Sequence, residues 1–297
     1  MLVDVYGRVT NGPIMPLLMI LTLGLITPVD SVAAKRPKKA PKPAPAQAEP
    51  LVEEQIVSST DKITKPSDTD AEAMRHNDLG VAFVFKGDLG QAIDEFTHAL
   101  RLQTNYFAAH LNLANTLLDI GKHDDAVNEF KAALQLKPDD LKAHNDLGVA
   151  LKEMGDLTGA IAEFKTVLRH RPFDVNAHNN LGVALKASGD LDGALAEYRT
   201  AVTLQPNDIN AHFNLGLALL EKHDPEAAIG EFRTALHLRP DDAKIRLNLG
   251  DALASLGNRM EAAQELRQYL RLELDTPLNR RWIEKAEAKL RDLEMPQ

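Results

Sequence analysis

Residues 175–208 have the sequence VNAHNNLGVALKASGDLDGALAEYRTAVTLQPND. It is followed directly by INAHFNLGLALLEKHDPEAAIGEFRTALHLRPDD, residues 209–242, which carries similar residues at most of the 34 positions. This 34-residue period holds from residue 73 onward. A fixed period of this length indicates an array of stacked repeats, and it overrides the number of domains that chain length alone suggests.

Five kinds of position mark the period. Proline recurs at Pro138, Pro172, Pro206 and Pro240, and histidine at His76, His110, His144, His178 and His212. Glycine recurs at Gly80, Gly148, Gly182, Gly216 and Gly250, with Ala114 at the equivalent place of the second repeat. A small residue recurs at Ala92, Ala126, Ala160, Ala194, Ala228 and Ala262. Four residues later stands a bulky one: Phe96, Phe130, Phe164, Tyr198, Phe232 and Leu266.

The residues of the third repeat predict a helical hairpin. One apolar face has i, i+4, i+7, i+8 spacing and comprises Ala143, Leu147, Ala150 and Leu151. Gly155 and Asp156 end this run, because Gly tolerates left-handed backbone and Asp caps the following helix. A second apolar face comprises Ala160, Ile161, Phe164, Val167 and Leu168, and it ends before Pro172. Asp174 is then expected to cap the next repeat.

Because one hairpin is too small to bury its own apolar face, neighbouring hairpins are expected to stack into a solenoid. Gly148 and Ala160 are expected to let the two helices of the third hairpin approach closely, with Phe164 filling the space beside them.

These marked positions resemble those of the tetratricopeptide repeat (TPR) family. The resemblance covers residues 73–274 and implies an all-α fold, a right-handed α-solenoid of six TPR hairpins. The predicted units are 73–106, 107–140, 141–174, 175–208, 209–242 and 243–276. The AHNNLG motif of residues 177–182 is similar to the repeats of O-linked N-acetylglucosamine transferases.

The end of the chain predicts a capping helix within residues 277–297. Its apolar face comprises Leu278, Trp282, Ile283, Ala286, Leu290 and Leu293. A terminal repeat needs such a helix, with an apolar side for the last hairpin and a soluble outer side. The single tryptophan is expected to belong to the core.

The first 34 residues are typical of an export signal, because Pro16 to Ile26 is a short apolar run and Val32-Ala33-Ala34 offers a cleavage site. An uncleaved membrane anchor and a wrongly assigned start codon stay open as alternatives. Residues 35–70 predict a Pro/Ala/Lys-rich disordered linker. A basic arm that binds anionic lipid or envelope polymer is the alternative role for this segment.

Composition excludes several classes of chemistry. The chain has no cysteine, and thus no disulfide or thiolate metal site, and its net charge of −9 disfavours nucleic-acid binding. The five repeated histidines are expected to pack within their hairpins, since helices about 8–10 Å apart hold them too far from one another to share a metal. The other histidines show no i, i+4 pairing. No phosphate loop or catalytic motif appears, so the sequence predicts neither enzyme activity nor a metal or cofactor.

The resemblance implies which positions of each first helix line the concave surface, and several of them carry carboxamides. The predicted ladder comprises Asn112, Asn115, Asn145, Asn179, Asn180, Asn214 and Asn248, with Asp78 and Asp146 as acidic rungs. Since Asn is a poor helix former, its repetition in mid-helix requires an explanation. One explanation is a ladder that donates to and accepts from an extended peptide backbone, similar to that of the transferases. The other is an inherited consensus on a solvated face.

The predicted function is therefore a non-catalytic scaffold, exported to the periplasm or cell envelope, that binds an extended segment of another protein. Acidity favours a partner with some positive charge. Membrane contact is expected only if the N-terminal segment stays uncleaved, and self-association is possible. The alternative is a non-catalytic subunit, or a truncated relative, of a TPR-containing glycosyltransferase.

Overall fold

The computed structural model describes residues 2–3, 9–10, 67–273, 276 and 279–295. It divides into two compact units, Met1–Lys65 and Pro66–Gln297. In the first unit, two short antiparallel strands, β1 (Leu2–Val3) and β2 (Val9–Thr10), pair Leu2 with Thr10 and Val3 with Val9. The rest of the predicted export segment, and the predicted linker up to residue 66, lie outside the described residues.

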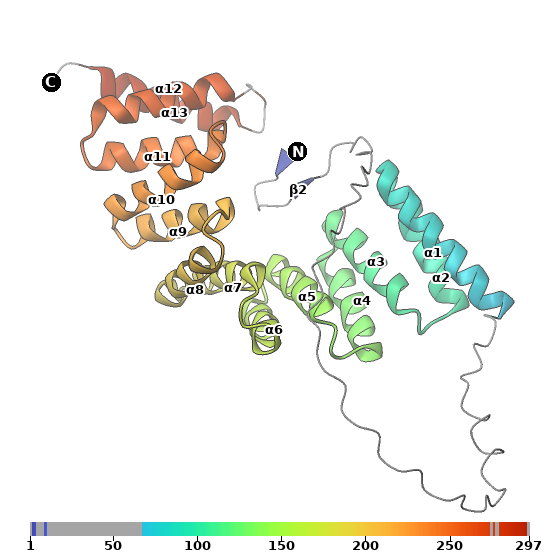
Figure 1. Cartoon of the computed structure of the whole chain (residues 1–297). Coiled ribbons are helices and arrows are strands. Elements are labelled where there is room, and N and C mark those ends of the chain that lie inside the picture. The colour runs from blue at the N-terminus through green and yellow to red at the C-terminus, as the bar shows by residue number, and fades with distance from the viewer. Residues whose placement is uncertain (1, 4–8, 11–66, 274–275, 277–278, 296–297) are drawn as a thin grey trace, which may run out of the picture. The chain divides into compact units, whose positions relative to one another are not determined.

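The described residues of the second unit form thirteen helices, arranged as six hairpins and one final helix (Figure 1). The first helices of the hairpins are α1 (Asp68–Lys86), α3 (Phe107–Asp119), α5 (Leu141–Met154), α7 (Val175–Ala187), α9 (Ile209–Glu221) and α11 (Ala243–Ser255). The second helices are α2 (Leu89–Leu102), α4 (His123–Leu136), α6 (Leu157–His170), α8 (Leu191–Leu204), α10 (Pro225–Leu238) and α12 (Arg259–Leu272), and the last helix is α13 (Arg280–Glu294). The prediction of an all-α solenoid is confirmed.

Most of these helices begin where an acidic side chain caps the backbone. The carboxylate of Asp140 accepts a hydrogen bond from the Ala143 amide at 2.8 Å, and Asp156 and Asp174 cap α6 and α7 in the same way. At α1, Ser67 and Asp70 form a reciprocal capping box. This box starts α1 at Asp68, ahead of residue 73, where the first repeat was expected to begin.

The turn inside each hairpin requires left-handed backbone at one residue. Gly155, with φ of 90°, supplies it in the third hairpin, where the sequence predicted a break. In the fifth hairpin the same place is taken by His223, with φ of 62°. A non-glycine residue in this region is uncommon, so the fifth turn carries backbone strain that the others avoid.

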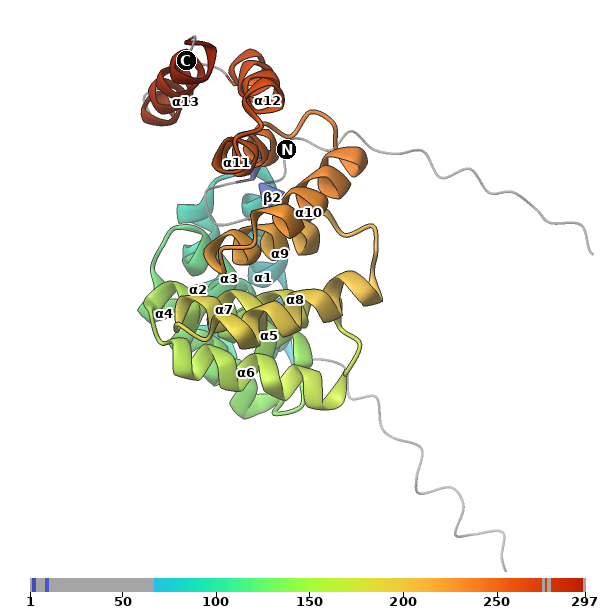
Figure 2. The ribbon, with the colours of Figure 1, turned by 90° about the vertical axis from the view of Figure 1, so that its left-hand side faces the viewer.

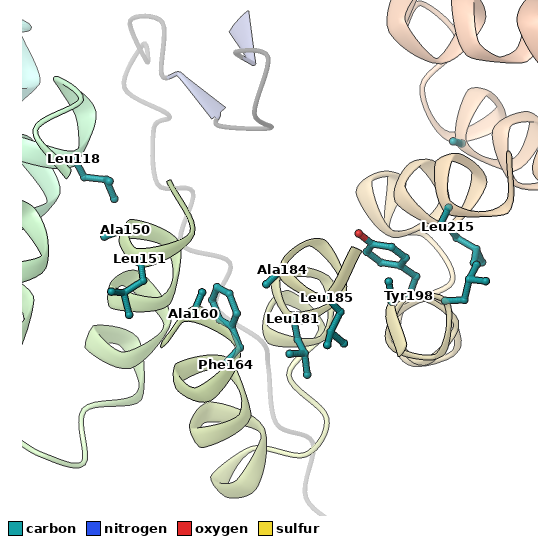
Figure 3. Packing of buried hydrophobic residues seen from close by; sticks show 14 of the residues in the cluster. Leu118, Ala150, Leu151, Ala160, Phe164, Leu181, Ala184, Leu185, Tyr198 and Leu215 are labelled. Carbon is teal, nitrogen blue, oxygen red and sulfur yellow. The ribbon is translucent and has the colours of Figure 1, made fainter. Parts of the chain in front are cut away.

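The two helices of a hairpin meet at a glycine and a bulky side chain. A Cβ added to Gly148 would lie 2.6 Å from the ring of Phe164, and one added to Gly182 would lie 2.6 Å from Tyr198. Phe164, Tyr198 and Ala160 are completely buried. Among the residues labelled in Figure 3, Phe164 and Tyr198 are the large side chains and the others are leucines and alanines. The apolar core runs from α2 to α12 without a break.

The hairpins stack so that the first helices form the more closely spaced row. Successive first helices contact one another, from α1 with α3 to α9 with α11, whereas each second helix packs on the first helix that follows it. In a curved stack, the more closely spaced row lies on the inner side. The surface of α1, α3, α5, α7, α9 and α11 is therefore the inner surface.

Helix α13 covers the end of the array and lies beside α12 in both views (Figures 1 and 2). Ala286 is buried against Leu266 and Tyr269 of α12. The prediction that Trp282 belongs to the core is wrong, because 51% of this residue is exposed. In the described part of the chain no further helix packs on the outer side of α13, so a large indole stays half outside. The Lys285 ammonium lies 5.5 Å from the centre of its ring.

Within the described ranges, none of the helices combines the length and the apolar character that crossing a membrane requires.

Candidate peptide-binding surface

The predicted ladder residues all lie on the first helices and therefore on the inner surface. Asp78 is exposed and Asn179 is buried, while the other members are half-buried: Asn112, Asn115, Asn145, Asp146, Asn180, Asn214 and Asn248. They do not form one uniform column. Their hydrogen bonds divide them into three groups, which differ in the donors and acceptors that stay open to a ligand.

The first group forms amide relays that join two neighbouring hairpins. Asn112 donates from Nδ2 to Oδ1 of Asn77 at 2.9 Å, and Asn77 donates in turn to the Asp78 carboxylate at 3.4 Å. This relay connects α3 to α1. Its acidic member accepts from an amide of its own chain, so the carboxylate of Asp78 is partly satisfied without a ligand.

The same relay recurs between α7 and α5. Asn180 donates to Oδ1 of Asn145 at 2.9 Å, and Asn145 donates to Asp146 at 3.2 Å. Lys142 adds an ion pair to Asp146 at 2.9 Å. Asn77 was not among the predicted ladder residues. The 35-residue spacing of Asn77 with Asn112 and of Asn145 with Asn180 is the sequence signal that could have revealed both relays.

The second group bonds to its own helix. Asn115 donates to the Leu111 carbonyl at 2.9 Å, and Asn248 donates to the Lys244 carbonyl at 2.8 Å. In each of these residues the amide nitrogen is engaged one turn back along the same helix. A ligand would therefore have to compete with this bond for the amide nitrogen.

The third group comprises Asn179 of α7 and Asn214 of α9. Asn179 is 8% exposed, and its Oδ1 is buried without a hydrogen-bond partner. These two residues stand 35 apart, like the members of the two relays, yet in the described part of the chain no hydrogen bond engages the Asn214 carboxamide. A buried carbonyl oxygen that lacks a donor costs about 1–3 kcal/mol, so this place on the inner surface favours a partner with N–H groups.

The repeated histidines form a separate and regular set of contacts. In the second hairpin His110 Nδ1 lies 2.6 Å from Glu129 Oε2, and Nε2 lies 2.9 Å from the Thr104 carbonyl oxygen. The carboxylate contact recurs in the first, third, fourth and fifth hairpins: His76–Glu95, His144–Glu163, His178–Glu197 and His212–Glu231. These histidines do lie within their hairpins, but they bridge two helices by hydrogen bonds as well as by packing.

The geometry of the His110 bridge favours the protonated ring. A carbonyl oxygen only accepts, so Nε2 of His110 donates to Thr104, and Nδ1 is left to donate to the Glu129 carboxylate. In the sixth hairpin Arg246 makes the same two contacts, at 2.6 Å to Glu265 and 2.7 Å to the Pro240 carbonyl. The hydrogen bond that His110 donates to Glu129 raises the pKa of His110; burial lowers this pKa, and the Thr104 contact adds to the rise.

Families of known proteins match the chain over most of these hairpins. The family described as "TPR repeat" matches residues 114–155 and 184–223, and the family described as "Tetratricopeptide repeat" matches residues 213–275. None of the curated proteins compared with the chain matches it significantly.

Solved structures give a wider match. The MamA protein is 26% identical, with a TM-score of 0.52 over 58% of this chain and 94% of that one. PilW, described as a widely conserved type IV pilus biogenesis factor, is 21% identical, with a TM-score of 0.64 over 73% of this chain and 98% of that one. The pilF protein of Pseudomonas aeruginosa is 17% identical, with a TM-score of 0.60 over 73% of this chain and 99% of that one. At these identities, the latter two show a shared fold only.

Proposed function

We propose that this chain, which carries tetratricopeptide repeats, is a non-catalytic scaffold that binds an extended segment of another protein along its inner surface. The repeats support a role in protein–protein interaction. The observation that carries the finer proposal is the pair Asn179 and Asn214, whose carboxamides lie on neighbouring first helices without the relay that joins equivalent residues elsewhere.

A carboxamide suits an extended backbone because it offers a donor and an acceptor side by side. A peptide lying across α7 and α9 would present alternating N–H and C=O groups at intervals of about 3.3 Å per residue. Rotation of the Asn179 side chain would give its unpaired Oδ1 such an N–H. Because both contacts are to the backbone, they would hold many peptide sequences, and charge would then select among them.

The charge of the chain supports a basic peptide. Net charge is −9, and the inner surface contains exposed Asp78. Lys142 already neutralises Asp146, so Asp78 at the first hairpin is the more available acid. We expect bound peptides to carry lysine or arginine.

The test uses a phage-displayed library of random twelve-residue peptides, panned against the full chain. Dissociation constants of the selected peptides are then measured by fluorescence anisotropy for the wild type and for the Asn179→Ala, Asn214→Ala double variant. Loss of two hydrogen bonds predicts affinity weaker by about tenfold or more.

The matched control is Asn128→Ala, which removes an exposed carboxamide from α4, a second helix outside the inner row. This variant should bind as the wild type does. Equal affinity of the double variant and the wild type would rule out the carboxamide pair as the peptide site.

We also propose that the protein is exported to the cell envelope, on the strength of the apolar run and the small-residue site in residues 1–34. Amino-terminal sequencing of the protein isolated from its native cells should find a chain that begins near Lys35. An intact Met1 on a cytosolic protein would contradict export.

A further inference from the structure

We propose that the first hairpin holds a divalent transition-metal ion, with zinc as the fitting ion, between His76 of α1 and Glu95 and His98 of α2. One ligand atom from each of these side chains lies within 4.8 Å of the other two. His76 Nδ1 and Glu95 Oε2 are 2.6 Å apart, and the two imidazole ring centres are 5.3 Å apart. Two imidazoles and a carboxylate are a donor set that suits zinc rather than magnesium or calcium, which prefer oxygen ligands.

The third ligand is what separates this hairpin from the other four His–Glu bridges. His98 follows Glu95 by three residues and thus stands on the same face of α2. The equivalent positions of the later repeats carry no imidazole or carboxylate: Ala132, Thr166, Thr200, Thr234 and Gln268. The packing of the repeats therefore does not require a histidine at the position of His98.

The second ring nitrogen of His76 is also differently placed. In hairpins two to five, Nε2 of the bridging histidine contacts a carbonyl of the preceding loop: Thr104, Pro138, Pro172 or Pro206. Within the described residues no repeat precedes the first hairpin, and Nε2 of His76 has no such bond. Because no second bond holds this ring, His76 can turn toward Glu95 and His98 more freely than its counterparts can turn in their hairpins.

The three side chains are also open to solvent. The His76 side chain is 29% exposed, against 7% to 17% for the four other bridging histidines, and His98 is exposed. Tetrahedral zinc keeps its ligands at about 2.0–2.1 Å, so small rotations of Glu95 and the exposed His98 suffice to bring the three donors together. The ion would take the place of the proton between His76 and Glu95. Three protein ligands leave a fourth position for water or for a partner's side chain.

Bound zinc would tie α1 to α2 at the start of the array. This is the end at which, within the described residues, no further helix covers the first hairpin. Bound metal would stabilise this end of the array, as α13 does at the other end. Because the ion binds the folded hairpin, it would raise the stability of the first hairpin by mass action.

The test is calorimetric titration of the full, untagged chain with zinc chloride, followed by cobalt(II) absorption to detect tetrahedral coordination. We expect one equivalent to bind. Because loss of even an outer partner of a ligand weakens metal sites by about 10–100-fold, His98→Ala and Glu95→Gln should each weaken binding more than about tenfold. Zinc should also raise the melting temperature of the wild type and not that of His98→Ala.

The matched control is His237→Ala, which removes an exposed histidine from α10, far along the chain from the cluster. It should bind zinc as the wild type does. His98 is exposed, so its removal leaves the fold intact, which far-ultraviolet circular dichroism checks. The proposal would be overturned if the wild type bound no zinc. It would also be overturned if His98→Ala bound zinc as tightly as the wild type.

Discussion

The third hairpin (α5–α6) and the sixth (α11–α12) have the same backbone arrangement but pack it with different side chains. In the third, Gly148 faces the ring of Phe164, and His144 bridges to Glu163. In the sixth, Gly250 faces the smaller Leu266, and Arg246 replaces the histidine. The third hairpin is packed between two hairpins, whereas the sixth has a hairpin on one side and the single helix α13 on the other. The position of a repeat in the array therefore decides how strictly its residues must follow the repeat pattern.

The largest effect is expected from Phe164→Ala. The ring is completely buried, and its loss leaves a cavity beside Gly148 in the middle of the array, so the free energy of unfolding should fall by about 3–5 kcal/mol. Urea denaturation followed by circular dichroism measures the change. Phe173→Ala is the control, because Phe173 is 78% exposed, and it should change stability by less than about 0.5 kcal/mol. A similar loss in both variants would contradict the account of the core.

The second effect separates the two hairpins directly. An added methyl group at Gly148 would lie 2.6 Å from the Phe164 ring, whereas one at Gly250 would lie 3.0 Å from the flexible Leu266. Overpacking of this kind costs about 1–3 kcal/mol, so Gly148→Ala should destabilise the protein clearly more than Gly250→Ala. Equal denaturation midpoints for the two variants would mean that the end of the array is packed as tightly as its interior.

A third effect concerns the fourth hairpin, where Tyr198 stands in place of phenylalanine. Its hydroxyl is buried without a hydrogen-bond partner, and burial raises the pKa of Tyr198 above its ordinary value. Tyr198→Phe removes the unsatisfied hydroxyl and should stabilise the protein by about 1 kcal/mol. The melting temperature, measured by calorimetry, should rise. A fall would show that the hydroxyl has a partner in solution.

The smallest effect should appear as a dependence of stability on pH. The pKa of His110 is raised in the folded protein, chiefly by Glu129. Its contribution to stability is therefore complete below the unfolded pKa of about 6.5 and is lost as the pH rises through the folded pKa.

His110→Arg imitates the sixth hairpin, where the charge of Arg246 does not titrate in this range. Denaturation at pH 6 and pH 8.5 should show a smaller loss of stability in this variant than in the wild type. An equal loss would assign the pH dependence to other groups.

The local structure could be predicted from the sequence, because the signals act within one helix or turn. Gly155 and Asp156 mark a real turn and cap, and Asp174 caps α7. The relays and bridges were not predicted, since they join residues of different helices. Asn77 and Asn112 belong to neighbouring hairpins, and His110 and Glu129 belong to the two helices of one hairpin. Such contacts depend on the stagger between helices, which the spacing within one helix does not reveal.

The same limit applies to the ends of the array. Trp282 fits the apolar face of a terminal helix by spacing, but its burial also requires a neighbour on the outer side of α13, which the described residues do not supply. Along the sequence His98 lies near only one of its two partners, Glu95, because His76 lies on the other helix of the hairpin.

The amide relays tie the first hairpin to the second and the third to the fourth, but they skip the junction between the second and the third. There Leu111 occupies the place of Asn77 and Asn145 and offers no amide. Two pairs of hairpins are thus linked by amides, whereas the other junctions between described hairpins lack such a link. We expect the array to bend more readily at the junctions without a relay, and therefore expect the curvature of the inner surface to vary there while each linked pair keeps its arrangement.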